Sequence, residues 1–220
     1  HSLRRRQRQM CIRDSSPEVM EMLESFGIPV MTEYSSYEEH PLGRVEWVKF
    51  FGALTDKEDR AEELFREQDE ILRQITANES TDRTVAFFYI TSNGLAQVRQ
   101  SSDYIAKSIA LAGGRYIFED MEDSGTGRST VNMQLEEFYA GAKDADYIIY
   151  NSSIDGGISS VSDLLDKCPV LSDFKAVQEG NVFCTTNDMY QQSMSIGYMI
   201  EDMHKMLTGE EDMRYLFRLK

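Results

Sequence analysis

The longest helical pattern in the chain runs from Thr55 to Asn78, with the sequence TDKEDRAEELFREQDEILRQITAN. Thr55 and Glu58 have the spacing of a capping box, in which the side chain of each accepts the backbone N–H of the other. The apolar residues recur at the i, i+3, i+4 spacing of one buried stripe. They are Ala61, Leu64, Phe65, Ile71, Leu72 and Ile75. Because neither Gly nor Pro interrupts the stretch, it predicts one rigid helix of about 30 Å. Such a helix is either a connector between two α/β regions or a surface helix of one domain.

The residues before this helix predict part of an α/β unit. Residues 16–27 predict a helix that ends at Gly27, residues 28–33 a short strand, and residues 42–54 a second helix. The side chains expected to face inward are Val19, Met20, Leu23 and Phe26 in the first helix, and Val45, Trp47, Val48 and Phe51 in the second. A strand at 28–33 needs a partner strand, and none precedes it in the sequence. We therefore expect an incomplete N-terminal lobe.

After the long helix the chain alternates between predicted strands and helices. Continuous apolar runs at 84–90, 146–150 and 181–185 are typical of strands buried on both faces. Helices are expected over residues 103–112, 135–142, 160–169, 170–177 and 193–207. Since crossovers between parallel strands are right-handed, this region predicts a parallel sheet covered by helices.

The first fifteen residues, HSLRRRQRQMCIRDS, differ in composition from the rest of the chain. They hold five of the 23 basic residues and a single acidic residue. A basic arm of this kind could bind nucleic acid. However, RQRQMCIRDS resembles translated sequencing-adapter sequence, so we expect residues 1–15 to be a non-native arm.

Composition excludes several functions. The net charge of −15 argues against binding to nucleic acid or to an anionic membrane surface. Of the three histidines, His1 lies in the expected arm and His204 on the polar side of the last predicted helix, so they cannot form a multi-imidazole metal site with His40. Cys168 and Cys184 lack C-x-x-C spacing, so two buried thiols are favoured over a disulfide or a zinc site. Neither a G-x-S-x-G elbow nor a Walker P-loop is present, so the sequence offers no evident catalytic set.

Polar and aromatic residues are concentrated in and beside the stretches that follow the predicted strands. Open α/β sheets bind ligands beyond the carboxyl ends of their strands, so we expect these residues to line a ligand site. They are Tyr34, Tyr37, His40 and Arg44 before the long helix, and Tyr89, Asn93, Arg99, Tyr104, Asn151, Met189 and Tyr190 after it. Aromatic faces suit large flat ligands, and arginine can hold an anionic chelate. The alternative is that many of them are ordinary surface or core residues.

One family resemblance rests on SYEEHPLGRVEWVKFFGAL and the acidic long helix after it. It continues through FFYITSNGLAQVRQSSDYIAKSIALAGGRYIFED, QLEEFYAGAKDADYIIYNSSIDG and DFKAVQEGNVFCT. Together these segments resemble the extracytoplasmic substrate-binding proteins of ABC importers for ferric siderophores, haem and cobalamin. The resemblance covers about residues 16–207.

The resemblance implies an α/β fold of two lobes, each a parallel sheet flanked by helices and joined by one backbone helix. We expect a partial N-terminal lobe at 16–54, the connecting helix at 55–78, a C-terminal lobe at 79–208 and a tail at 209–220. The ligand, a ferric siderophore, haem or a corrinoid, would lie between the lobes, and no cofactor is implied. The first part of the N-terminal lobe and a lipoprotein signal are expected to be missing.

The resemblance also implies a membrane permease as the partner of a monomeric, non-enzymatic protein located outside the cytoplasm. In the family, an acidic residue on each lobe meets arginines of the permease. The matching positions are Glu137 or its neighbour Glu136, and a residue near Glu18. Two alternatives stay open. One is a reductase-like enzyme on a similar scaffold, and the other is a protein that binds zinc or manganese directly.

Overall fold

The computed structural model describes residues 17–122, 129–153, 157–189 and 192–220. The chain divides into two compact units, residues 1–34 and residues 35–220. The arm predicted at 1–15 lies outside the described residues. The lobe boundaries predicted from the sequence stay a prediction.

The first unit contains the helix α2, Pro17–Ser25, and the predicted stop residue Gly27 follows it with a φ of +70°. The inward face predicted for α2 is wrong, because none of its residues is buried, and Phe26 after it is 73% exposed. The strand predicted at 28–33 is also wrong, since these residues form no ladder. A strand needs a partner for its backbone groups, and the described part of this unit contains none.

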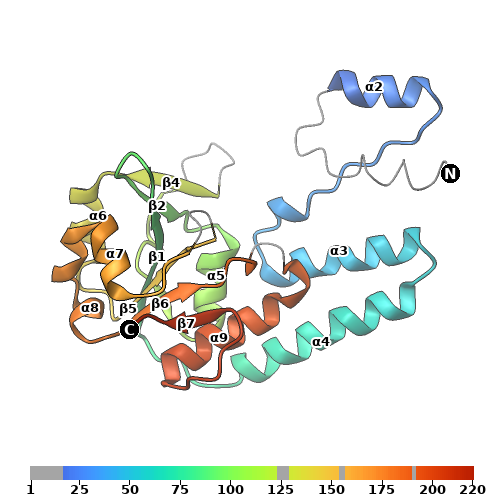
Figure 1. Cartoon of the computed structure of the whole chain (residues 1–220). Helices are drawn as coiled ribbons and strands as arrows, with labels where there is room; N and C mark the ends of the chain where they lie inside the picture. Colours follow the sequence, from blue (N-terminus) through green and yellow to red (C-terminus); the bar gives the residue numbers. More distant parts are fainter. Residues whose placement is uncertain (1–16, 123–128, 154–156, 190–191) are drawn as a thin grey trace. The chain divides into compact units, whose positions relative to one another are not determined.

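The second unit is built on one mixed sheet (Figure 1). Its strands are β1 Thr84–Ile90, β2 Ala96–Arg99, β3 Arg115–Tyr116, β4 Thr130–Met133, β5 Tyr147–Tyr150, β6 Val182–Thr185 and β7 Leu216–Arg218. Their order is β4-β2-β1-β5-β6-β7, and β3 also pairs with β1. The strands β1, β5 and β6 are parallel, as predicted. The short strand β3 also pairs parallel with β1, whereas β2, β4 and β7 are antiparallel. The α/β class is therefore confirmed, but the sequence predicts no strand at β2 or β4 and places β7 in a tail.

Helices cover both faces of this sheet (Figure 1). They are α3 Pro41–Leu54, α4 Glu58–Thr76, α5 Tyr104–Leu111, α6 Leu135–Ala142, α7 Val161–Lys167, α8 Lys175–Gln178 and α9 Ile196–Thr208, with the short helices η2 Ser35–Tyr37, η3 Pro169–Asp173 and η5 Ser193–Ser195. One core lies between the sheet and α3, α4, α5 and α9, and the other lies between the sheet and α6, α7 and α8. Alternate residues of β1 enter opposite cores, Phe87 the first and Phe88 the second.

The helix α4 is uninterrupted over 19 residues, so the long helix predicted at 55–78 is confirmed in its central part. The predicted capping box is wrong. Lys57 occupies the N-cap position of α4, and Thr55 instead ends α3, where its hydroxyl donates to the Phe51 carbonyl at 2.8 Å. The chain reverses between the two helices through Asp56, whose φ is +55°.

Tertiary contacts decide which helix residues are buried. Ala61, Leu72 and Ile75 are buried in α4, together with Gln68, whereas the predicted Leu64, Phe65 and Ile71 are only half-buried. In α3, Val45 is buried, Trp47 and Val48 are half-buried, and Phe51 is 40% exposed, against the prediction.

The middle of α4 crosses the start of α9 at very close range. The Gln68 side-chain oxygen accepts the Gly197 N–H at 2.9 Å. A Cβ at Gly197 would lie 2.9 Å from that oxygen and 3.1 Å from the Gln68 carbonyl. The crossing therefore requires glycine at position 197, and it fixes α4 onto the sheet-bearing part of the unit.

Candidate functional site

Three of the predicted site residues lie together in the second unit. Arg44 comes from α3, Arg99 from the end of β2, and Tyr104 from the start of α5. The Arg44 guanidinium carbon lies 3.8 Å from the centre of the Tyr104 ring. An Arg99 guanidinium nitrogen lies 3.8 Å from a carboxylate oxygen of Asp103, which also caps α5 by accepting the Ile105 N–H at 2.9 Å. We call Arg44, Arg99, Asp103 and Tyr104 the arginine cluster.

Burial governs the electrostatics of the arginine cluster. Loss of solvent lowers the pKa of Arg44 and raises the pKa values of Asp103 and Tyr104 from their ordinary values. The nearby Arg99 charge opposes the last two shifts. Charge pairing is stronger in such a partly desolvated setting than in water. Arg44 is half-buried while the other three are buried, so Arg44 is the most accessible member of the cluster.

Two residues that organise this cluster are absent from the predicted set. The buried Tyr116 hydroxyl accepts the Arg99 N–H at 3.0 Å and donates to the Arg99 carbonyl at 2.7 Å, which fixes the end of β2. Asp103 opens the helix predicted at 103–112, so its capping role could be inferred from the sequence. Its contact with Arg99 depends on the β1–β2 hairpin, which the sequence reading missed.

The other predicted residues are spread more widely. Tyr37 and His40 lie on the exposed segment before α3, and His40 Nδ1 accepts the Leu42 N–H at 3.2 Å as the cap of α3. Tyr34 is exposed in the first unit. Tyr190 lies outside the described residues.

The residues that follow the parallel strands differ in exposure. Asn93 is exposed in the turn after β1, whereas Tyr89 is half-buried within β1 itself. Asn151 and Met189 are buried, and the Asn151 N–H donates to the Phe88 carbonyl at 2.8 Å. These two are therefore packed into the unit and do not lie on an open surface.

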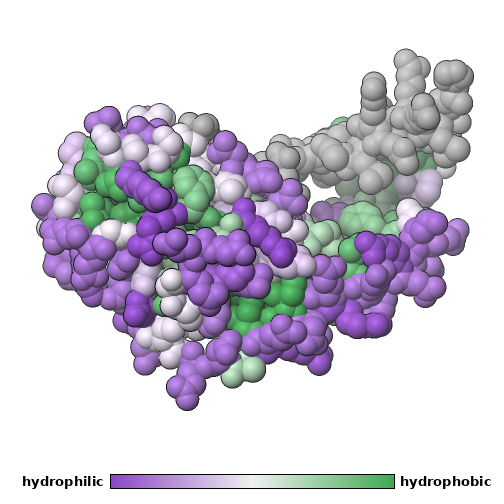
Figure 2. Space-filling model, turned by 60° about the horizontal axis from the view of Figure 1, so that its bottom comes forward, coloured by the Kyte–Doolittle hydropathy of each residue, from purple (hydrophilic) through white to green (hydrophobic). Residues whose placement is uncertain are grey.

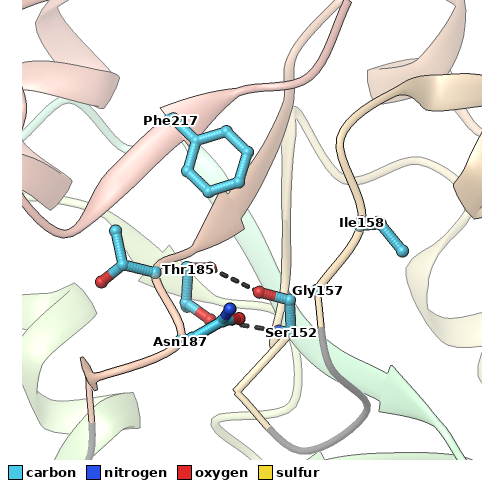
Figure 3. Close-up of a pocket in the computed structure, with 7 residues that line it drawn as sticks. Ser152, Gly157, Ile158, Thr185, Asn187 and Phe217 are labelled. Atoms are coloured by element: carbon cyan, nitrogen blue, oxygen red, sulfur yellow. Dashed lines mark hydrogen bonds between the residues drawn. The ribbon is translucent and has the colours of Figure 1, made fainter.

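A pocket of about 290 Å³ lies beside the ends of β5 and β6 (Figure 3). It is lined by Ser152, Gly157, Ile158, Thr185, Thr186, Asn187 and Phe217. The Ser152 N–H donates to Thr185 Oγ1 at 3.1 Å, and the Ser152 hydroxyl donates to the Thr185 carbonyl. None of the lining side chains carries a charge and none belongs to the predicted set, so the pocket is chemically different from the arginine cluster.

The acidic residues nominated for docking lie on helix surfaces. Glu136 and Glu137 are exposed in the first turn of α6, while Phe138 is buried and Leu135 and Tyr139 are half-buried. Glu18 is exposed in the first turn of α2.

Cys168 and Cys184 are both buried thiols, as predicted, and burial raises the pKa of Cys168. The described residues contain no group of three or more His, Cys, Asp or Glu placed to hold a metal ion. Within the same residues, no helix has the length and apolar character needed to cross a bilayer.

Residues 15–189 match the family model described as periplasmic binding protein. The chain belongs to this family. The resemblance stated from the sequence is thereby confirmed at family level. The description of this family names binding and no catalysis, which favours a binding protein over the reductase-like alternative.

Curated relatives of this periplasmic binding protein come from Methanocaldococcus jannaschii. One uncharacterized lipoprotein is 34% identical over 79% of this chain and 41% of the relative, and a second is 27% identical over 94% of this chain and 54% of the relative. The chain thus spans about half the length of these relatives.

Solved structures share the fold. The periplasmic haem-binding protein HutB of Vibrio cholerae has a TM-score of 0.68 at 17% identity, covering 84% of this chain and 71% of that one. A protein of an ABC-type Fe3+-hydroxamate transport system from Saccharomonospora viridis has a TM-score of 0.65 at 19% identity, covering 85% and 64%. At these identities the similarity establishes the α/β architecture with helices flanking a parallel-rich sheet.

Proposed function

We propose that this periplasmic binding protein is the extracytoplasmic substrate-binding component of an ABC importer. It captures a chelated metal, such as a ferric siderophore, haem or a corrinoid, and delivers it to a membrane permease. The observation that carries the proposal is the arginine cluster, because it offers guanidinium charge and an aromatic ring within a family of solute-binding proteins. Relatives named as lipoproteins support a location outside the cytoplasm.

Two lines of evidence support a metal chelate as the ligand. Solved relatives of the same fold are named as haem-binding or as part of Fe3+-hydroxamate transport. Haem and many ferric siderophores present carboxylates or other anionic oxygens, which guanidinium groups can bind through paired hydrogen bonds. The exposed ring of Tyr37 adds flat apolar surface of the kind such ligands use.

The test is direct binding of haem and of a ferric trihydroxamate. Trp47 is the single tryptophan of the chain, so quenching of its fluorescence reports binding. Replacement of Arg99 by alanine should weaken the binding of an anionic chelate by about 1–3 kcal/mol, because a partly desolvated charge pair is lost. Arg115→Ala is the matched control, since Arg115 is an exposed arginine paired with Glu119 at 3.2 Å. Unchanged affinity in both Arg44→Ala and Arg99→Ala would remove the electrostatic part of the proposal.

We also propose that Glu137, with Glu136, docks the permease. Glu137→Ala in an intact protein should leave chelate affinity unchanged and slow uptake, because a rim charge pair acts mainly on the encounter rate. Asp166→Ala, which removes an exposed acid on α7, is the control. Normal uptake with both glutamates replaced would contradict the docking role, and weaker chelate binding would place them in the ligand site. Glu18 is the proposed counterpart on α2.

A further inference from the structure

Arg44 holds the segment that precedes its own helix. Its Nε donates to the Glu38 carbonyl at 2.9 Å, and a terminal guanidinium nitrogen donates to the Ser36 carbonyl at 2.6 Å. Both acceptors belong to the exposed segment that carries Tyr37 and His40. The planar fork of a guanidinium can satisfy two carbonyls at once, which an ammonium group cannot do in the same geometry.

Two contacts connect α5 with this segment and with the arginine that binds it. Arg44 stacks over the Tyr104 ring at 3.8 Å, and Lys107, one helical turn further along α5, pairs with Glu39 at 2.6 Å. The Arg44 guanidinium is half-buried, and this loss of solvent lowers its pKa. Residues 36–39 are therefore held between α3 and α5.

The side chain of Glu38 completes this arrangement. Its Oε1 accepts the indole N–H of Trp47 at 3.1 Å. It also packs over Gly43, where an added Cβ would lie 3.0 Å from Glu38 Oε2. Three contacts from α3 thus fix one residue of an otherwise exposed segment, and none of them uses an apolar core.

We infer that Arg44 is a positioning residue, which holds residues 35–40 against α5 before any ligand is bound. Together with the Lys107–Glu39 pair it forms what we call the clasp. The inference deepens the proposed function, since Tyr37 and His40 of that segment are proposed ligand contacts. A segment that is already ordered does not have to lose conformational freedom when the ligand binds. In this role the effect of Arg44 on ligand binding depends more on the planar shape of its guanidinium group than on its charge.

Hydrogen exchange of the 220-residue chain tests the clasp without any ligand. Arg44→Lys keeps the positive charge and removes the fork, so amide exchange in residues 35–40 should become about tenfold faster. Lys107→Ala should accelerate the same amides by less than about fivefold, because an exposed ion pair stabilises little. Exchange in β1 and β5 should not change in either variant. Arg115→Lys removes a guanidinium group elsewhere on the surface, so it should leave the exchange rates of residues 35–40 unchanged.

Haem titration, followed by haem absorbance, then separates positioning from direct contact. If Arg44 positions the segment, Arg44→Lys weakens haem binding nearly as much as Arg44→Ala does. Retention of affinity in Arg44→Lys, or unchanged exchange of residues 35–40, overturns the inference. If the wild-type chain binds neither haem nor a ferric trihydroxamate while the exchange results hold, the proposed function fails and the clasp stands.

Discussion

Replacement of Phe138 by alanine should lower the free energy of unfolding by about 3–5 kcal/mol, because it opens a large cavity in a close-packed core. The Phe138 side chain on α6 is fully buried. Its ring centre lies 4.6 Å from that of Phe88 on β1, and it stacks on Phe174 at 5.6 Å. The loss would therefore affect the contact between α6 and the central strand and the contact between α6 and the segment before α8. Urea unfolding followed by circular dichroism measures it.

Phe51→Ala is the matched control for this experiment. Phe51 lies on α3 and is 40% exposed, so the same truncation removes less buried area and leaves no closed cavity. Its effect should stay below about 1 kcal/mol. Equal losses in the two variants would contradict the placement of Phe138 at the centre of the second core.

Asp202→Ala should have the second-largest effect, a loss of about 2–5 kcal/mol of stability. Asp202 on α9 is fully buried, and its carboxylate accepts the N–H groups of Arg214 and Tyr215 at 2.8 and 2.5 Å. Without that acceptor two backbone donors lose their partner directly before β7. Hydrogen exchange should therefore accelerate in residues 214–218 more than in β1. Uniform acceleration across the sheet would contradict a local anchoring role.

The pH dependence of stability provides a second readout for Asp202. Burial raises the pKa of its carboxyl in the folded protein. A raised acid pKa favours the folded state most at low pH, and that contribution is lost as pH rises through the folded pKa. Asp202→Asn does not titrate, so it should lack this component. The stability of the wild type relative to Asp202→Asn should accordingly fall as pH rises from about 4. An increase in the stability of the wild type relative to Asp202→Asn over that pH range would contradict this prediction.

Much of the fold could be predicted because strong periodic patterns come from burial. The run at 84–90 became β1 with the predicted bounds, and 135–142 became α6. Short antiparallel strands were missed, since β2 and β7 have only four and three residues and depend on a neighbouring strand for definition. The prediction of a buried face on α2 was wrong for a related reason. An amphipathic pattern shows which side can be buried, but burial needs a partner surface.

The candidate site was predictable in its residue types but less so in its contacts. Arg44, Arg99 and Tyr104 were nominated from their positions beside strand ends, and the fold brings them together. The partners of these residues could not be inferred, because the pairing of Arg99 with Asp103 depends on a hairpin that sequence periodicity did not reveal. For the same reason the carbonyl contacts of Arg44 appear only when the turn at 35–40 is in place.

The crossing of α4 and α9 has a consequence for how this sequence can diverge. Gly197 leaves no room for a side chain against Gln68, and the same glycine supplies the N–H that the Gln68 side chain accepts. A lineage that gains a Cβ at 197 must either turn the Gln68 side chain away from its donor or move the two helices slightly apart. Positions 68 and 197, which lie far apart in the chain, should therefore be inherited as a pair.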